Sequence, residues 1–387
     1  VTSGSGSVTF DKTLPTIAIT AAEVSSGATS NDTSITLIFT SSEATTNFVS
    51  GDISVTNGSI ANFASSTSKV YTAIFTPSSD GATTIDVAGS TFTDAVGNNN
   101  TVSNTFAWTY DSTSPTITIS STTSGVSDGS TTNDSSVSLT FTSSEATTDF
   151  VVGDITVTGG LLTNFVSTSS TVYTATFTPS ADGATTIDVL SSEFSDPVGN
   201  VNSAASQFNW TYDGTVPTMT IASTTNGVTD GSTTNDSSIA LTFTSSEATT
   251  NFAAGDVSVS NGKLSNFTAT SSTVYTATFT PSASGATTID VLSSEFSDPV
   301  GNVNSSSTQF NWTYDGTLPV LTQVTAIATP TNDTTPSYVF TTGEAGTITS
   351  SLGFSTTTSA VTGSNQTITF NALAEGTYTG KTLTVTD

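Results

Sequence analysis

One stretch of sequence recurs three times along this chain, at a constant spacing. The segment Ser-Ser-Glu-Ala-Thr-Thr carries its glutamate at Glu43, Glu145 and Glu247, so successive copies lie 102 residues apart. A Gly-Asp pair and a Tyr-Thr-Ala-x-Phe-Thr-Pro segment keep the same interval. A solenoid repeats roughly every 20 to 50 residues, whereas about a hundred residues make one small domain. The 387-residue chain is therefore expected to be a row of similar domains.

Within each copy, apolar residues alternate with polar ones, which is the period of a β-strand. Residues 137–141 run Val-Ser-Leu-Thr-Phe, and residues 208–212 run Phe-Asn-Trp-Thr-Tyr. Turns rich in Gly, Asn, Asp, Ser and Pro separate such runs, and no helical pattern of useful length occurs. About seven short strands in a hundred residues indicate an immunoglobulin-like sandwich rather than a barrel. The predicted fold class is all-β, with tandem immunoglobulin-like β-sandwich domains in an elongated array.

A second marker, Asp-x-Thr-x-Pro, separates the copies and starts at Asp11, Asp111, Asp213 and Asp315. Its first interval is two residues shorter than the others, a change that a surface loop absorbs at little cost. The predicted segments are residues 1–10, the tail of a preceding Ig-like domain; 11–110, 111–212 and 213–314, three Ig-like repeats; and 315–387, a divergent and truncated Ig-like domain.

The aromatic rows that contain Trp108, Trp210 and Trp312 admit two interpretations. They can form platforms on which sugars stack, or they can form one face of the core. Alternating aromatic residues on a strand most often point into the core. We therefore expect these tryptophans to be buried, and we expect each Gly-Asp pair to form a turn where a strand begins.

The composition excludes several classes of function. Four lysines and no Arg, His or Cys stand against 31 Asp plus Glu, which gives a net charge of −27. Without His and Cys there is no Ser-His-Asp triad, no thiolate nucleophile and no His/Cys zinc site. So few basic residues do not form a surface for nucleic acid or for an anionic membrane. No apolar run reaches the length of about 18 residues that a membrane span needs, and the first residues lack the pattern of a signal peptide.

The acidic residues that recur in each copy fall where one end of a sandwich gathers its loops. In a seven-strand sandwich, the start of strand A, the B–C loop and the F–G loop meet at the same pole. Oxygen ligands without nitrogen or sulfur suit Ca²⁺, and weak sites of about 10⁻⁴–10⁻³ M serve extracellular modules. The sequence therefore predicts Ca²⁺ at the domain junctions. The predicted ligands are Asp11, Glu43, Asp94 and Asn98; Asp111, Glu145, Asp196 and Asn200; and Asp213, Glu247, Asp298 and Asn302.

Turn chemistry is the competing interpretation of the same residues. Asp-x-Thr-x-Pro can form an Asx-turn ahead of a strand, and the segment 196–200 can form a turn in which Gly199 takes a positive φ. Glu145 can accept hydrogen bonds from loop amides. At the opposite pole of the first repeat, Asn31, Asp32 and Asp80 are also expected to lie together. Both interpretations fit the sequence.

No enzyme is expected. Paired carboxylates can serve a glycosidase, but each copy carries the same sparse acids, and no cleft-forming insertion distinguishes one copy from the others.

The ordered motifs resemble the bacterial Ig-like repeats of very large exported surface proteins. In the second repeat the matching residues are Ser144-Glu145-Ala146, Gly153–Val157, Asn164-Phe165, Tyr173–Pro179 and Phe194–Asn200. The resemblance covers about residues 11–314, and residues 315–387 match more loosely. It implies a secreted protein of the bacterial cell surface: an adhesin, a biofilm matrix protein or, in gliding bacteria, a long surface filament.

The predicted function is that of a structural stalk or filament segment of a large cell-surface adhesin, projecting a distal binding region for attachment, biofilm formation or gliding. The alternative hypothesis is that each repeat is itself a carbohydrate- or protein-binding module that acts by avidity. The expected partners are neighbouring Ig-like repeats of the same chain, an outer-membrane or secretion-machinery anchor, and a surface ligand. Neither nucleic acid nor membrane insertion is expected.

Overall fold

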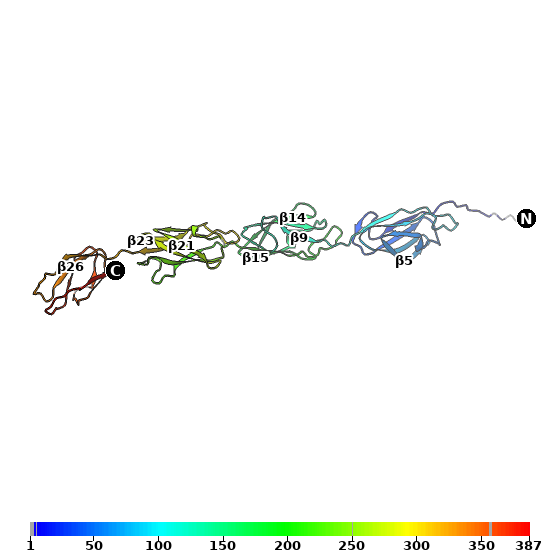
Figure 1. Ribbon diagram of the computed structural model, residues 1–387. Coiled ribbons are helices and arrows are strands. Elements are labelled where there is room, and N and C mark those ends of the chain that lie inside the picture. The colour runs from blue at the N-terminus through cyan, green and yellow to red at the C-terminus, as the bar shows by residue number, and fades with distance from the viewer. Residues whose placement is uncertain (1–3, 5, 250, 356–357) are drawn as a thin grey trace. The chain divides into compact units, whose positions relative to one another are not determined.

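The computed structural model describes residues 4, 6–249, 251–355 and 358–387. The chain divides into two compact units, Val1–Thr215 and Val216–Asp387. The first unit holds two repeats, and the second holds the third repeat and the divergent domain (Figure 1). Among the described residues the regular structure is β-strand, apart from three short 3₁₀ turns.

The second repeat illustrates the architecture that all three repeats share. One sheet has the strand order β9-β11-β14-β13, and the other has the order β10-β16-β15-β12. Neighbouring strands are antiparallel except for the pair of β10 and β16, which is parallel. The strands are β9 (Ile117–Ser121), β10 (Ser130–Thr132), β11 (Val137–Ser143), β12 (Ile155–Thr158), β13 (Gly160–Ser167), β14 (Val172–Pro179), β15 (Gly183–Val189) and β16 (Phe208–Tyr212).

This strand order is that of an immunoglobulin sandwich, with strands A, B, E and D in one sheet and C, F and G in the other. The predicted all-β, tandem Ig-like fold is confirmed. The repeat has one strand more than the seven that we expected, because the short strand β10 continues the sheet beyond strand G. Its three residues, Ser-Thr-Thr, have no apolar alternation that would mark a strand in the sequence.

The first and third repeats have the same two sheets. The strands of the first are β1 (Ile17–Ala21), β2 (Thr29–Ser30), β3 (Ile35–Ser41), β4 (Ile53–Thr56), β5 (Gly58–Thr67), β6 (Val70–Pro77), β7 (Gly81–Val87) and β8 (Phe106–Tyr110). Those of the third are β17 (Met219–Ser223), β18 (Ser232–Thr234), β19 (Ile239–Ser245), β20 (Val257–Ser260), β21 (Gly262–Ala269), β22 (Val274–Pro281), β23 (Gly285–Val291) and β24 (Phe310–Tyr314).

Each Gly-Asp pair ends a 3₁₀ turn just before strand C, as the sequence predicted. The turns are η1 (Ser50–Asp52), η2 (Val152–Asp154) and η3 (Ala254–Asp256). In the second repeat the Asp154 carboxylate closes the turn by accepting a hydrogen bond of 2.7 Å from the Val151 amide.

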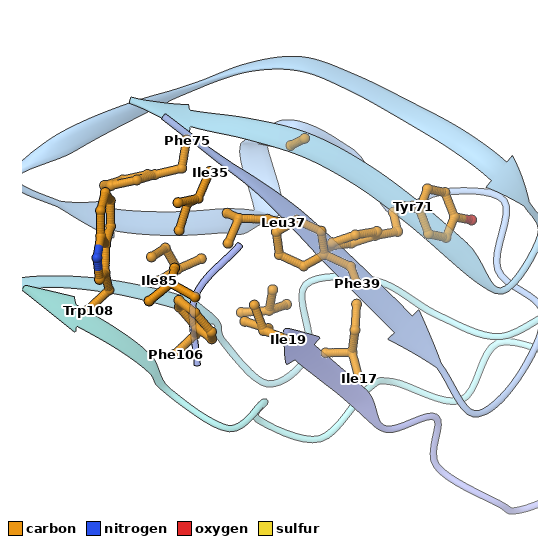
Figure 2. Close-up of a cluster of buried hydrophobic side chains, with 14 of the residues drawn as sticks. Ile17, Ile19, Ile35, Leu37, Phe39, Tyr71, Phe75, Ile85, Phe106 and Trp108 are labelled. Atoms are coloured by element: carbon orange, nitrogen blue, oxygen red, sulfur yellow. The ribbon is translucent and has the colours of Figure 1, made fainter. Parts of the chain in front are cut away.

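The aromatic rows lie in the core, as expected. Figure 2 shows Trp108 of strand G beside Phe75 of strand E, with ring centroids 6.0 Å apart in an edge-to-face arrangement. Trp108 is only 1% exposed, and its Nε1 donates a hydrogen bond of 3.0 Å to Ser30 Oγ on β2. A buried Trp supplies large apolar area provided that its N–H finds a partner. The short strand β2 therefore supplies the polar partner that lets Trp108 be buried.

The divergent domain is a smaller sandwich of two three-stranded sheets, β25-β26-β29 and β28-β27-β30. Its core cluster contains six buried apolar residues among those described, against fifteen in the second repeat. The strands are β25 (Leu321–Thr325), β26 (Ser337–Thr342), β27 (Gly346–Ser350), β28 (Ser359–Ala360), β29 (Gln366–Thr369) and β30 (Leu383–Thr386).

The predicted tail over residues 1–10 lies partly outside the described residues, at positions 1–3 and 5. In the described part no strand is formed, and Val8 and Phe10 are 92% and 78% exposed.

Candidate metal site

The predicted acidic residues converge at one pole of each repeat in the first unit. Asp111 precedes β9, Glu145 follows β11, and Asp196 lies in the loop between β15 and β16. One carboxylate oxygen from each of these three residues lies within 4.8 Å of the others. The first repeat brings Asp11, Glu43 and Asp94 together in the same way.

The loop around Asp196 explains how a carboxylate is held at this pole. Asp196 is 5% exposed, and its Oδ1 accepts hydrogen bonds from the amides of the three residues Val198, Gly199 and Asn200 at 2.8 to 3.0 Å. Gly199 has a φ of +95°, which favours glycine. The turn interpretation is therefore correct for Asp196, and the same turn points its carboxylate toward the pole.

Asn200 holds the loop and the linker together. Its Nδ2 donates to Asp196 Oδ2 at 2.9 Å and to the main-chain oxygen of Asp111 at 3.0 Å. Its Oδ1 accepts a hydrogen bond of 3.3 Å from Asn31. In the first repeat Asn98 likewise donates to Asp94 Oδ2, at 2.8 Å. These asparagines thus position the carboxylates, and the three acids of each cluster are the candidate ligands of a cation.

The linker aspartates also make the predicted Asx-turns. Asp111 Oδ1 accepts a hydrogen bond of 3.2 Å from the Thr113 amide, and Asp11 Oδ1 accepts one of 2.9 Å from the Thr13 amide. An aspartate that uses one oxygen in a turn still presents carboxylate lone pairs to a cation. Turn chemistry and metal ligation are therefore compatible at these positions.

The electrostatics of the cluster are repulsive. The pKa of Glu145 is raised by burial and then by the negative charges of Asp111, Asp196 and Asp80. Burial also raises the pKa of Asp94, but hydrogen bonds from Asn98 and the loop amides outweigh it, so that the pKa is lowered overall.

The first cluster differs from the second by one nearby lysine. Lys69 lines the same small cavity as Asp11, Glu43 and Asp94, and its Nζ donates a hydrogen bond of 2.8 Å to the main-chain oxygen of Ser42. Burial and the neighbouring aspartates raise the pKa of Glu43, and the Lys69 charge opposes that rise. In the second and third repeats the corresponding residues are Thr171 and Thr273, so these repeats lack the lysine.

The ligands predicted for the third repeat fall in both units. The second unit contains Glu247, Asp298 and Asn302, and the end of the first unit contains Asp213. Asp298 Oδ1 accepts hydrogen bonds from the amides of residues 300, 301 and 302. Asn302 Nδ2 donates a hydrogen bond of 2.9 Å to Asp298 Oδ2. The loop that positions the carboxylate is therefore the same as in the second repeat.

A further acidic cluster was not predicted. Asp315, Glu344 and Asp387 of the divergent domain also place carboxylate oxygens within 4.8 Å of one another. The signals that could have found it are the Asp-x-Thr-x-Pro marker at Asp315 and the segment Gly343-Glu344-Ala345, which resembles Ser144-Glu145-Ala146.

The opposite pole of the first repeat holds the next linker. Asp80 Oδ1 accepts hydrogen bonds from the Ser112 amide and hydroxyl at 2.8 and 2.7 Å, and Asp80 Oδ2 accepts one from Thr113 at 2.7 Å. These hydrogen bonds, with that of Thr113 first, lower the pKa of Asp80. Asp32 instead accepts a hydrogen bond of 2.7 Å from Ser30. Asp80 is thus a clamp on residues 112 and 113.

The donor set fits a hard cation. Each cluster offers three carboxylates, and Ca²⁺ takes six to eight oxygen ligands that include main-chain oxygens and water. Bound Ca²⁺ would supply positive charge that neutralises the three acids. In the second repeat Asp111, Glu145 and Asp196 are the residues that would hold it.

The chain belongs to a family of bacterial Ig-like domains, whose model matches residues 11–110, 111–212 and 213–315. Among solved structures it is similar to invasin, a bacterial integrin-binding protein, with 16% identity over 92% of this chain and 74% of invasin, at a TM-score of 0.37. It is also similar to InvD of Yersinia pseudotuberculosis, with 17% identity over 70% of this chain and 88% of InvD, at a TM-score of 0.30. No curated protein sequence matches the chain.

The described residues contain no helix that is long and apolar enough to span a membrane.

Proposed function

We propose that this chain is a stalk segment of an extracellular bacterial surface adhesin, in which tandem sandwiches act as spacers and Ca²⁺ binds at the poles. The observation that carries the proposal is the recurrence of the same three-carboxylate cluster beside the linker of each repeat in the first unit. Membership of a bacterial Ig-like family supports a structural role for the repeats. A distal region of the adhesin would then attach the cell to a surface during biofilm formation or gliding.

A spacer needs domains that fold on their own and linkers that do not swing freely. Each repeat has its own core cluster, so length can grow by adding copies without redesign. The linker between the first two repeats is held from both sides. Asp80 of the first repeat binds Ser112 and Thr113, and Asn200 of the second repeat binds the main chain of Asp111.

Calcium would complete this arrangement by removing the repulsion in the cluster. Without a cation, burial and then the negative charges of Asp111 and Asp196 raise the pKa of Glu145, so its ionised form is disfavoured. A divalent cation reverses the sign of that interaction. Binding to the folded state alone stabilises it, by about 2.7 kcal/mol when the ion concentration is a hundred times the Kd.

The test is thermal unfolding of the full chain in Ca²⁺, in Mg²⁺ and in chelator, with and without the substitution Glu145→Gln. Calcium is expected to raise the unfolding midpoint of the second repeat, and Glu145→Gln is expected to remove most of that rise. Glu193→Gln is the matched control, because Glu193 is an exposed acid of the same repeat outside the cluster. A midpoint that is the same in Ca²⁺ and in chelator rejects the metal part of the proposal.

The binding-module hypothesis is the weaker candidate. Its best sequence evidence was the aromatic rows, and Trp108, Trp210 and Trp312 are each 1% exposed, so they offer no stacking face. Binding of a single repeat to a glycan array would nevertheless favour it over the spacer.

The proposed role is also non-enzymatic. Hydrolysis of a polysaccharide by the purified chain would overturn that part of the proposal.

A further inference from the structure

Three places in the chain pair an asparagine with a following glycine. These Asn-Gly pairs start at Asn57, Asn226 and Asn261. Because glycine has no Cβ, the main-chain nitrogen that follows the asparagine is not shielded by a side chain. That nitrogen is able to attack the asparagine carboxamide wherever the local structure lets the two groups meet. The three pairs differ in this respect.

Asn226 and Gly227 are the central residues of a turn between β17 and β18. The Val228 amide donates a hydrogen bond of 3.2 Å to the main-chain oxygen of Thr225, and Gly227 has a φ of +81°. These are the features of a type II turn, which needs a positive φ at its third residue. Asn226 and Gly227 are both exposed, whereas Val228 is buried and anchors the turn.

The Asn226 side chain is not held in one orientation. Within the part of the chain that the structure describes, its carboxamide makes no hydrogen bond. Apart from the adjoining residues, no described atom lies within 4 Å of the place that a Cβ on Gly227 would take. The approach of the Gly227 nitrogen to the Asn226 Cγ therefore meets no packed neighbour.

The carboxamides of the other two pairs are held by hydrogen bonds. Asn57 Nδ2 donates a hydrogen bond of 2.8 Å to the main-chain oxygen of Ser79, and Asn57 Oδ1 accepts one of 2.9 Å from Ser79 Oγ. Asn261 Nδ2 likewise donates a hydrogen bond of 2.9 Å to the main-chain oxygen of Ala283. Each of these bonds must break before the carboxamide turns toward the next residue.

The glycines of these two pairs are fixed as well. Gly58 and Gly262 are the first residues of β5 and β21. A Cβ on Gly58 would lie 2.2 Å from the Phe75 ring, and one on Gly262 would lie 2.3 Å from the Phe279 ring. Both rings are fully buried. The main chain at these glycines thus packs directly on the core, and a shift toward the preceding side chain would cost core contacts.

We infer that Asn226 is a site of spontaneous deamidation and that the fold protects Asn57 and Asn261. The Gly227 nitrogen attacks the Asn226 Cγ, and the new C–N bond closes a succinimide ring. The Cγ–Nδ2 bond breaks, and the nitrogen leaves as ammonia with the proton of the Gly227 amide. Water then opens the ring at either carbonyl, which gives aspartate or isoaspartate. Water is the only co-reactant, and nothing is oxidised or reduced.

The sandwich should tolerate this change. In the first repeat Val24 takes the buried position of Val228, and the chain reaches it without the two residues that correspond to Asn226 and Gly227. That repeat nevertheless forms the same two sheets, so the turn is dispensable for the fold. Either product replaces a neutral amide by a carboxylate and makes the chain more acidic. The inference depends neither on the stalk nor on calcium.

The test is peptide mapping by mass spectrometry after incubation of the full chain in ¹⁸O-labelled water at neutral pH. Each deamidation adds a labelled oxygen, so the three sites are scored separately. In the folded chain Asn226 is expected to convert at least about tenfold faster than Asn57 or Asn261, because their hydrogen bonds must first open. In denaturant the three sites should convert at similar rates.

The second repeat supplies a matched pair of variants. It has the same turn, with Gly125 at a φ of +82° and the same hydrogen bond across it, but Ser124 stands where the third repeat has Asn226. Asn226→Ser should abolish labelling in the third repeat. Ser124→Asn should create a second labelled site that converts at the rate of Asn226.

Three outcomes would overturn the inference. The first is that Asn57 or Asn261 converts as fast as Asn226 in the folded chain. The second is that Asn226 stays unlabelled in the folded chain over a time in which the denatured chain is labelled. The third is that the Ser124→Asn chain gains no labelled site in the second repeat.

Discussion

The second repeat and the divergent domain are two sandwiches that differ in the size of the core that their described residues form. In the repeat, strand G brings Phe208 and Trp210 into a core of fifteen buried residues. In the divergent domain the core cluster of the described residues has six members. The comparison teaches that strand G contributes an aromatic pair to the larger core of the repeat.

The largest expected effect comes from deleting the tryptophan that distinguishes the two domains. Trp210→Ala should destabilise the second repeat by about 3–5 kcal/mol, because a large buried side chain is replaced by a cavity. Calorimetry of the full chain should show one transition moving to lower temperature while the others remain. Val201→Ala, at a 50% exposed position of the same repeat, is the control and should change little. Equal movement of all transitions would contradict independent folding.

Hydrogen exchange compares the stability of the second repeat and the divergent domain without any substitution. Strands β11 and β26 both occupy position B, and Phe141 and Phe340 on them are both 0% exposed. The amides of β26 should nevertheless exchange faster, because the smaller core gives a lower free energy of opening. Equal protection of the two strands would show that the larger core does not raise the free energy of opening.

A smaller effect is expected on Ca²⁺ affinity, which should differ between the first and second repeats. Lys69 contributes a positive charge beside the first acidic cluster, so the first repeat should bind Ca²⁺ more weakly than the second. Lys69→Thr should raise Ca²⁺ affinity of the first repeat on the order of threefold, a modest change because an exposed charge is screened by solvent. Calorimetric titration measures it, and Lys263→Thr, outside the acidic clusters, is the control. An unchanged affinity would exclude a role for Lys69.

The smallest expected effect is on the dependence of stability on pH. The pKa of Asp80 is lowered in the folded chain by hydrogen bonds from Thr113 and Ser112. Its contribution is therefore present above the unfolded value of about 3.9 and is lost as the pH falls through the folded value. Asp80→Asn should lower the unfolding midpoint slightly at pH 7 and not at strongly acidic pH. A difference of the same size at both pH values would contradict this origin.

The third repeat provides an internal comparison for this clamp. There Ser284 takes the place of Asp80 and accepts a hydrogen bond of 3.0 Å from the Gly316 amide. A serine does not titrate in this range, so Ser284→Ala should show no such pH dependence.

Much of the fold could be predicted because the sequence repeats its own pattern. Alternation along residues 137–141 and 208–212 located strands B and G, and the aromatic rows located the core. Strand β10 was not predicted, because Ser-Thr-Thr has no apolar alternation. Its role depends on a hydrogen bond from Trp210, which is distant in the sequence.

The candidate site was predictable to the same extent. The topology of a sandwich was enough to bring Asp111, Glu145 and Asp196 together. The sequence did not reveal that Asn200 uses its amide to hold the loop, because rotamers depend on packing. The cluster at Asp315 lay outside the 102-residue frame, and the position of Lys69 relative to the acids depends on where strand E begins.

Small-angle scattering of the full chain in Ca²⁺ most directly tests the central claim, which is that successive sandwich domains make an extended chain. Strands of about eight residues span roughly 26 Å, so four domains in a row predict a maximum dimension beyond about 100 Å. A single globule of 387 residues would instead have a radius of gyration of about 21 Å. We predict a maximum dimension beyond about 100 Å. A radius of gyration of about 21 Å would contradict the proposed stalk.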